Sequence, residues 1–461
     1  MSINRILNIG HSGMVAASLG TAATSHNITN SSTEGYSRQR VAQKPRPIHH
    51  GGGLAISSPT RVQDSFVDRR LLSAISLEGE ASARSDSLRS LDSMFADIGG
   101  AVGDALDNFE SAIADLSNDP DSDAARQLVL TRTTQLAQSF NQASADLDAA
   151  QDDANGRIRL ALGQLNEKLQ TIGDLGRDIV SGSTIGEDVS TLMDQRDQLV
   201  REVAEYLPVT VLDQPHGAVS VLLAGSRSLV PVDGPVPQLL HDVDANGNTT
   251  ILRQGSGAPE DITSLITSGK IAGYLSARDG AIADAQADLD QLAYDIATQY
   301  NAVHAAGQGR DGASRNLFEV LPAVVPPTGS AEALAISADV VGNPDGIAAA
   351  LDGTLPSDNR NALALLDLAQ TDIASGGTAS ASEAFSAMLA DVGISIQSAN
   401  TKADNATVIR EQAQAMRDAI SGVSTDEEMV ALMQFQRAYQ ASLRVVETAD
   451  AMLNELLNMR R

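Results

Sequence analysis

The spacing of apolar residues predicts that most of this chain is helical. Over long stretches apolar side chains recur every three or four positions, the period at which an α-helix turns one face to a partner. Prolines, glycines and an aspartate-rich stretch at 119–121 interrupt this period. The expected helices cover residues 3–30, 64–116, 124–179, 189–206, 276–305, 361–372 and 383–459, the last with a break at Ser421-Gly422.

Between residues 207 and 262 the pattern changes to an alternation of apolar and polar residues, which is typical of strands with one buried face. Asn246-Gly247, flanked by two such stretches, is a strong signal for a tight hairpin turn. We therefore expect a small β domain inserted between helices, and two short strands in the turn-rich residues 306–360. The expected strands of the β domain are 209–212, 218–223, 227–232, 238–243 and 248–254.

The first predicted helix is weak by itself. It contains Gly10, Gly13 and Gly20, and each glycine destabilises a helix by about 1 kcal/mol relative to alanine. Such a helix needs a partner, and its small residues permit a close approach to one. The larger apolar residues expected on its contact stripe are Ile3, Leu7, Met14 and Ile28.

The last predicted helix, residues 425–457, has the heptad spacing of a coiled coil. Ser424 or Thr425 can cap its start, and the acidic residues that follow suit the helix dipole. A single-chain core helix would show the same period, but polar seam positions such as Gln436 and Asp450 favour a seam with several partners. The expected assembly interface is one heptad row, Leu432, Tyr439, Val446 and Leu453, and a second row, Met429, Gln436, Leu443, Asp450 and Leu457.

Composition and charge exclude several classes of function and of binding site. The 461 residues suffice for two to four domains, and the absence of cysteine excludes disulfides and thiolate metal sites. The net charge of −27 argues against nucleic acid or an anionic membrane as a partner. The ends are nearly neutral: residues 1–40 carry three arginines and one glutamate, and residues 421–461 carry six acids and four arginines. Near-neutral ends can pack against copies of themselves. No apolar run approaches the roughly 20 residues that span a bilayer, and the first twenty residues make a poor secretory signal.

Two segments have the residues of a binding motif without its context. Asp242, Asp244 and Asn246-Gly247 match the start of a calcium-binding loop, but Arg253 stands where the bidentate glutamate belongs. The glycine spacing of 307–312 is that of a dinucleotide-binding turn, yet a helix precedes it instead of a strand. We therefore expect no catalytic, cofactor or metal site, and no enzyme activity.

Both ends of the chain carry recognisable sequence signatures. They are Ser12-Gly13-Met14, Asn27-Ile28-Thr29-Asn30 and Gly35-Tyr36-Ser37-Arg38-Gln39 near the start, and Asp426-Glu427-Glu428-Met429 and Phe435-Gln436-Arg437-Ala438-Tyr439 near the end. These stretches resemble the terminal segments of bacterial flagellar axial proteins, and their combination resembles the hook-associated protein 1 family. Internal stretches at 60–64, 194–199, 289–292, 301–304, 307–318 and 357–363 are similar to that family as well. Met14 and Thr29 depart from it, since leucine and alanine are usual there.

The resemblance implies a structural axial protein at the junction between hook and filament, needed for filament assembly. It implies location in the bacterial flagellum after type III export, without a cleaved signal peptide. The implied partners are copies of itself, hook protein, the next junction protein and an export chaperone that binds the C-terminal helix, with no nucleic acid and no membrane insertion. Another axial protein of the hook-protein type is an alternative, although it would be mostly β where residues 64–206 indicate helix. A soluble helical binding or chaperone module is a further alternative.

Together these observations predict a mainly α fold with an inserted β domain. Residues 1–40 plus 421–461 are expected to form a terminal domain, in which the two helices make an antiparallel α-helical coiled coil. Residues 41–206 plus 263–420 are expected to form a long, rod-like helical middle domain with short strands. Residues 207–262 are expected to form a small outer β domain.

Overall fold

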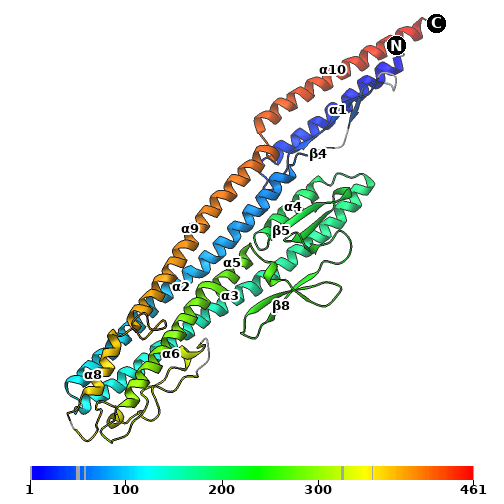
Figure 1. Cartoon of the computed structure of the whole chain (residues 1–461). Coiled ribbons are helices and arrows are strands. Elements are labelled where there is room, and N and C mark those ends of the chain that lie inside the picture. The colour runs from blue at the N-terminus through cyan, green and yellow to red at the C-terminus, as the bar shows by residue number, and fades with distance from the viewer. Residues whose placement is uncertain (1–2, 48–51, 57–58, 323–326, 356, 460–461) are drawn as a thin grey trace.

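The computed structural model describes residues 3–47, 52–56, 59–322, 327–355 and 357–459. The molecule is a long rod, and the two ends of the chain lie beside each other at one tip (Figure 1). The chain runs down the rod and returns, so its first and last helices are antiparallel neighbours. The predicted fold class, mainly α with terminal helices paired antiparallel and a small β region, is confirmed.

Within the described residues, ten α-helices build the rod. They are α1 (Ile3–Thr29), α2 (Ser65–Asn118), α3 (Asp123–Ile185), α4 (Ser190–Ala204), α5 (Lys270–Ser276), α6 (Ala283–Ala306), α7 (Ser330–Ala333), α8 (Arg360–Asp367), α9 (Ala381–Ser421) and α10 (Thr425–Asn458). Side-chain caps define where the longest ones begin. The Asp64 carboxylate accepts from two backbone N–H groups of α2, and Ser424 accepts from the third residue of α10.

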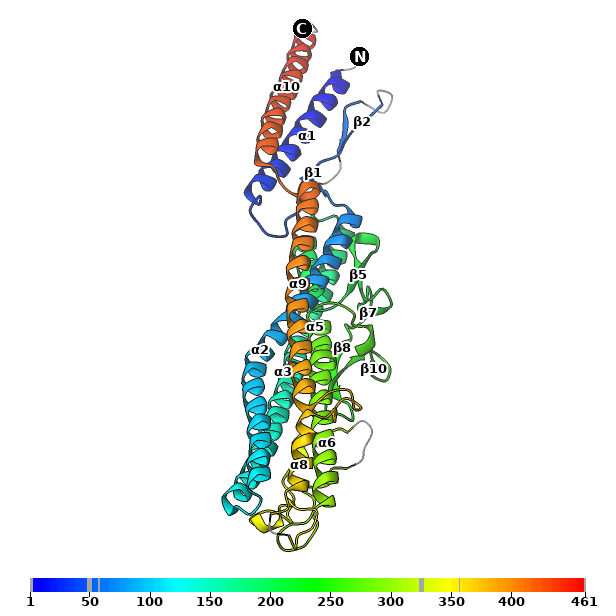
Figure 2. The same cartoon turned by 60° about the vertical axis from the view of Figure 1, so that its left-hand side comes forward.

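Four long helices, α2, α3, α6 and α9, lie along one another and form the body of the rod (Figure 2). Their inner faces share one apolar core, in which Phe109, Phe140 and Phe318 are fully buried. The rings of Phe109 and Tyr300 on α6 pack in an edge-to-face arrangement, with centroids 5.0 Å apart. Because Phe318 belongs to the loops at the far end, these loops are anchored in the same core.

The helix predicted at 276–305 begins earlier, at Lys270, and contains a π-helical turn (Ala277–Ile282) between α5 and α6. In this turn the buried Arg278 guanidinium donates to the side chain of Asn155 and to the carbonyl of Thr249, each at 2.8 Å. The turn therefore ties the body to the β region, a role that the apolar period alone cannot indicate.

The β region consists of two antiparallel three-stranded sheets on one side of the rod. One sheet holds β5 (Val209–Asp213), β6 (Val219–Leu223) and β7 (Arg227–Val230); the other holds β8 (Gln238–Val243), β9 (Thr249–Gln254) and β10 (Glu260–Asp261). The first five of these strands lie where the alternating pattern predicts them. The predicted hairpin joins β8 to β9: Asp244 accepts from the N–H groups of Asn246 and Asn248, each at 2.8 Å, and Gly247 has φ +83°.

Both sheets bury their apolar sides against helices. Val221, Leu229 and Ile251 are fully buried in one cluster with Leu165 and Leu169 of α3. The β region is therefore an outer lobe that shares a core with the body, instead of a unit with a core of its own. The domain boundaries at 207 and 262 stay a prediction.

The strand prediction for residues 306–360 is wrong for the part that the structure describes. Isolated bridges join Gln308 to Ala350 and Phe318 to Ile336, without forming ladders. Helix side chains form hydrogen bonds with backbone groups that would otherwise pair within a sheet. The side chain of Asn301 on α6 accepts from the N–H groups of Leu317 and Phe318 at 2.9 and 2.8 Å. A chain bonded in this way needs no neighbouring strand.

Candidate assembly interface

Small residues on α1 make the contact with α10. The facing pairs are Gly10 with Val446, Gly13 with Ser442, and Gly20 with Phe435. A Cβ atom at Gly20 would lie 2.5 Å from the Phe435 ring, which is closer than such atoms approach in proteins. The glycines that make α1 weak in isolation therefore allow the two helices to approach each other closely.

The sequence-predicted residues of α1 occupy the flanks of this contact. Ile3, Leu7, Met14 and Ile28 are half-buried. The fully buried positions of α1 hold small or polar residues, namely Gly10, Ala16, Ala17, Gly20, Ala23, Thr24 and Asn27. The apolar spacing predicts large residues at this contact, whereas the close approach of the two helices requires small ones.

On α10 the two predicted heptad rows have different surroundings. Leu432, Val446 and Leu453 of the first row are half-buried on the α1 side, and Tyr439 is exposed at its edge. In the second row Met429 is 56% exposed, Leu443 is 39% exposed, and Gln436 and Asp450 are exposed as well. The side chain of Leu457 lies outside the described residues. The second row is therefore uncovered in one subunit, and its role in assembly stays a prediction.

A polar joint connects the terminal helix pair to the body, and Asn27 at the end of α1 is its centre. Asn27 is 1% exposed, and its amide donates to the carbonyl of Gln39 at 2.9 Å and to the Glu428 carboxylate at 3.0 Å. Its oxygen accepts from the Tyr36 hydroxyl at 2.8 Å and from the N–H of Gln39 at 2.9 Å. All four hydrogen-bonding positions of this side chain are used.

The Glu428 carboxylate is buried and paired. Arg38 Nε lies 2.7 Å from Glu428 Oε1, and its Nη1 lies 3.1 Å from the exposed Glu427. Burial, followed by the charges of Asp194 and Glu428, raises the pKa of Tyr36 above its usual value. The Tyr36 hydroxyl therefore stays protonated and available as the donor to Asn27.

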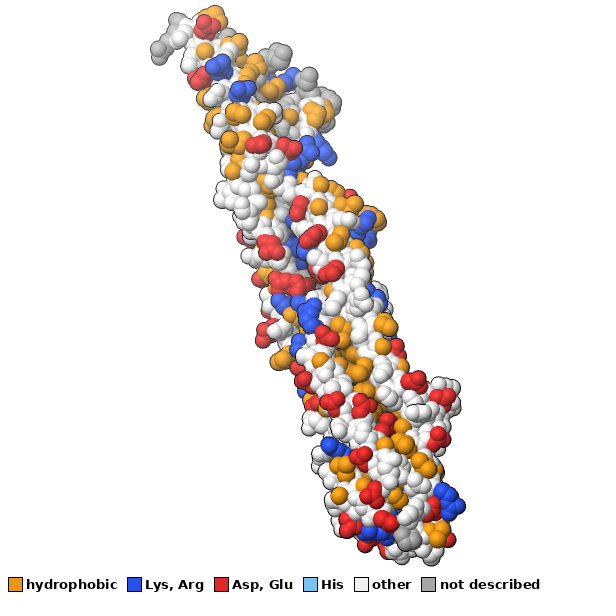
Figure 3. All heavy atoms as spheres, turned by 90° about the vertical axis from the view of Figure 1, so that its left-hand side faces the viewer, with side chains coloured by type: hydrophobic (Ala, Val, Ile, Leu, Met, Phe, Trp, Pro, Cys, Tyr) orange, Lys and Arg blue, Asp and Glu red, His pale blue; other side chains and the backbone are white. Residues whose placement is uncertain are grey.

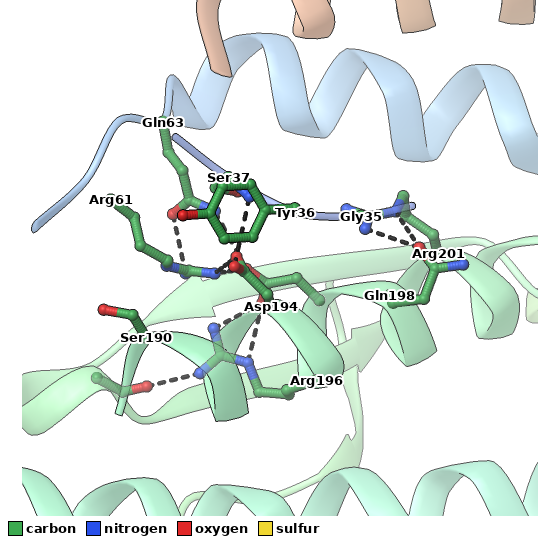
Figure 4. A network of polar contacts seen from close by, with 12 residues as sticks. Gly35, Tyr36, Ser37, Arg61, Gln63, Ser190, Asp194, Arg196, Gln198 and Arg201 are labelled. Carbon is green, nitrogen blue, oxygen red and sulfur yellow. Dashed lines mark hydrogen bonds and ion pairs between the residues drawn. The ribbon is translucent and has the colours of Figure 1, made fainter. Parts of the chain in front are cut away.

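A second cluster joins the segment after α1 to α4 (Figure 4). Arg61 on β4 (Thr60–Arg61) donates to Asp194 and Asp197, each at 2.8 Å, and Arg196 lies 2.6 Å from Asp197. Burial alone would raise the pKa of Asp197, but the guanidinium groups of Arg196 and Arg61 lower it below its usual value. The N–H of Ser37 donates to Asp194 at 3.3 Å, so the segment is attached by backbone as well as by side chains.

Arg417, near the end of α9, completes the joint. Arg417 is 6% exposed, and its guanidinium donates to the carbonyls of Gly35 and Tyr36 at 3.0 and 3.1 Å. Gly35 has φ +81°, and a Cβ atom there would lie 2.6 Å from the Arg201 guanidinium. The positive φ favours glycine at position 35, whereas the Arg201 side chain could move to make room for a Cβ atom.

Several joint residues lie within the sequence signatures, which by themselves indicate no structural role for them. Asn27, Tyr36, Arg38 and Glu428 belong to the terminal signatures, and Asp194 belongs to an internal one. A usable signal was present: arginines and acids are placed at helix ends, in segments where apolar residues are few. Their pairing across about 400 residues, as between Arg38 and Glu428, has no local trace in the sequence.

The candidate binding motifs have structural explanations. Asp244 and Gly247 form the hairpin turn between β8 and β9. Gly307 ends α6 and has no room for a side chain, since a Cβ atom there would lie 2.8 Å from the carbonyl oxygen of Ala350. In the part of the chain that the structure describes, no cluster of three His, Asp or Glu side chains could hold a metal ion. No described helix combines the length and apolarity that crossing a membrane requires.

Comparison with known proteins identifies first the class and then the family. Residues 417–459 match the C-terminal segment of flagellar basal body rod FlgEFG proteins, so the last helix is similar to that of a class of flagellar proteins. Residues 88–318, half of the chain, match the helical domain of flagellar hook-associated protein FlgK. The chain belongs to the FlgK family of flagellar hook-associated proteins, which are structural components of the flagellum.

The similarity to individual relatives extends over nearly the whole chain. Flagellar hook-associated protein 1 of Escherichia coli is 25% identical over 99% of this chain and 100% of its own length. That of Bacillus subtilis is 25% identical over 95% of this chain and 94% of its own. The flagellar hook junction protein FlgK of Burkholderia pseudomallei has the same fold, with a TM-score of 0.69, 16% identity and coverage of 77% of this chain and all of that one.

Proposed function

We propose that this protein is a structural subunit of the junction between hook and filament, and that the filament needs it in order to assemble. The uncovered face of α10 carries the proposal. Its exposed large apolar residues are Met429, Val430, Met433, Tyr439, Leu443, Val445 and Met452. A long helix that packs chiefly on α1 and leaves this much apolar surface in water gains stability when further helices cover it. The names of the relatives support the position at the junction.

The proposed interface is the second heptad row of α10, with the flanking residues of α1 beside it. Copies of the same chain would cover this face within the junction, with hook protein on one side and the next junction protein on the other. Before assembly an export chaperone would bind the C-terminal helix, because its apolar side chains would otherwise be exposed to water during export. Figure 3 shows hydrophobic side chains along the terminal helices, at the upper end of the rod, and many acidic ones on the body.

Export through the flagellar type III channel without a cleaved signal peptide is part of the proposal. It is supported by the absence of cysteine, which precludes cross-links during transit, and by the three glycines that make α1 easy to unfold. The charged groups at the joint support a structural role, since Arg38, Arg61 and Asp197 are all engaged in ion pairs. We therefore propose no catalytic turnover.

We also propose that three parts of the chain have different roles. Residues 1–40 plus 421–461 would act as the assembly unit, and residues 41–206 plus 263–420 as a stiff spacer. Residues 207–262 would be an outer lobe that assembly does not use. The break at Gly422 and the polar joint support the first boundary, because the joint holds two helical units together mainly by polar contacts.

A substitution on α10 tests the proposal. In cells that lack their own copy, the full chain carrying Leu443→Asp should be exported but should not join hooks to filaments. The matched control is Leu160→Asp, since Leu160 is 72% exposed on α3, away from the terminal pair. Filament-bearing hooks counted by electron microscopy give the readout, and the secreted protein in the medium reports export. Normal filament numbers with Leu443→Asp would contradict the proposal.

A further inference from the structure

An unusual charge pattern marks the segment between α1 and α2. In a chain of net charge −27, residues 35–63 contain five arginines and lysines and no acid. Arg38 and Arg61 are paired at the joint. The other three, Arg40, Lys44 and Arg46, are exposed, and none forms an ion pair with a described residue. These three residues, called the basic strand below, have unused positive charge.

The basic strand lies on the flank of the helix pair that α1 forms. Strand β2 (Gln43–Pro45) pairs with β3 (Leu54–Ile56), and the N–H of Leu54 donates to the Ser12 hydroxyl of α1 at 3.1 Å. In Figures 1 and 2 this hairpin lies beside α1 on the side away from α10. Helix α1 therefore has α10 on one side and the basic strand on the other.

A complementary stripe lies on α10. Glu447 and Asp450 are exposed, and neither forms an ion pair with a described residue. They follow Leu443 by four and seven positions, which places all three on the same side of the helix. This is the side of the second heptad row, and no lysine or arginine belongs to that row. Glu447, Asp450, Leu443, Gln436 and Met429 are called the acidic stripe below.

The stripe and the strand face opposite ways. Near the joint, Lys44 of the basic strand and Gln434 of α10 line the same cavity, which has a volume of about 820 Å³. At 100° per residue, Gln434 and the acidic stripe lie on opposite sides of the α10 face that contacts α1. The two charged surfaces of one chain therefore cannot meet each other.

The stripe and the strand nevertheless lie at the same level along the pair. Ser12, which holds the hairpin, is next to Gly13, and Gly13 faces Ser442 on α10. Gly10 faces Val446, the neighbour of Glu447 in the sequence. A second copy placed beside the first at the same height would bring its strand against the stripe.

We propose that copies of this chain pack side by side, with the basic strand of one copy on the acidic stripe of the next. The proposal rests on the proposed function, a layer built from many copies. Opposite and complementary flanks on one chain make a heterologous contact that repeats from copy to copy and generates a ring or a helix. Met429 and Leu443 supply apolar area at this contact, while the charges set register and rate of association.

Charge exchange tests the contact in the full chain. The strand variant carries Lys44→Glu and Arg46→Glu, and the stripe variant carries Glu447→Lys and Asp450→Lys. Each should lower the fraction of filament-bearing hooks about tenfold in cells lacking their own copy, with export unchanged. The chain with all four substitutions should return to within about twofold of the unaltered protein, because the pairs are restored with reversed sign. Arg89→Glu, on an exposed arginine of α2, is the control and should have no effect.

Two results would overturn the inference. Normal filament numbers with both double variants would show that these charges make no contact between copies. If the chain with all four substitutions does not regain filament-bearing hooks, strand and stripe do not face each other. Leu443→Asp distinguishes this inference from the proposed function. If Leu443→Asp prevents filament attachment while both double variants attach filaments normally, only the strand-to-stripe contact is excluded.

A second measurement remains decisive if a charge variant is not exported. Because the chain has no cysteine, Arg46→Cys with Glu447→Cys in one chain introduces the only two thiols. Mild oxidation of isolated hooks that carry this protein should give a ladder of cross-linked copies, whereas each single-cysteine chain should give none. Monomers alone from the two-cysteine chain would contradict the contact.

Discussion

Replacing His304 with glutamine should remove a pH-dependent part of the stability of the rod's far end. His304 lies at the end of α6 and is fully buried. Its Nε2 accepts from the N–H of Ala348 at 3.0 Å, so the proton is on Nδ1, which donates to the carbonyl of Arg315 at 2.6 Å. Protonation of Nε2 would set a new N–H against that of Ala348.

Burial lowers the pKa of His304 from 6.5 to about 4. Since the folded value is the lower one, the fold favours neutral histidine, and its contribution is fully present above pH 6.5 and lost as the pH falls towards 4. At 1.36 kcal/mol per pKa unit, linkage gives a loss of about 2 kcal/mol between pH 7.5 and pH 5. Burial raises the pKa of Glu110 and of Asp295, and these carboxyls act in the opposite direction. The comparison with the His304→Gln variant cancels their effect.

Urea titrations of the full chain at pH 7.5 and pH 5 measure this difference. The unaltered protein should lose about 2 kcal/mol more free energy of unfolding between the two pH values than His304→Gln does. The matched control is His241→Gln, since His241 is exposed on β8, and it should behave like the unaltered chain. Equal pH dependence in the unaltered protein and in His304→Gln would refute the reasoning.

Three further substitutions test the terminal pair and the joint. Gly20→Leu should prevent α1 from packing on α10, because Phe435 occupies the space, and filament-bearing hooks should be lost while the body's calorimetric transition is kept. Asn27→Ala breaks four buried hydrogen bonds and should destabilise the joint by about 3–5 kcal/mol. Asn30→Ala removes one exposed hydrogen bond from a half-buried residue and should cost less than about 1 kcal/mol, both measured by hydrogen exchange in assembled hooks. Asp197→Asn leaves Arg196 without its carboxylate and Arg61 with Asp194 alone, and should lower the body's free energy of unfolding by about 3 kcal/mol in urea titrations. An unchanged free energy of unfolding would contradict this expectation.

The parts of the fold that depend on local patterns could be predicted from the sequence. The long helices and the strands from Val209 to Gln254 follow the apolar period, because one buried face forces that period on the residues. The turn at Asn246-Gly247 follows from backbone conformation alone. The helix break before Thr425 follows from its capping serine.

The rest depends on contacts between distant segments. The residues at the tightest contact of α1 could not be predicted, because a close helix contact selects glycine and alanine, while the hydrophobic pattern points to Ile3 and Met14. The joint could not be predicted, since the partners of Asn27 and Arg417 are fixed only when both ends of the chain meet. The π-helical turn at Gly280 places Arg278 against the Thr249 carbonyl of β9. The apolar period of the helix does not indicate this long-range contact.

Hydrogen exchange along α10 tests most directly the claim that the terminal helices are the assembly device. The comparison is between the full chain secreted by cells that cannot attach filaments and the same chain in isolated hooks. The amides of residues 429–453 should exchange rapidly in the free subunit, because α1 is weak and the α10 face is uncovered, and should become protected in the assembled junction. Strong protection of these amides in the free subunit, equal to that in the assembled form, would contradict the account.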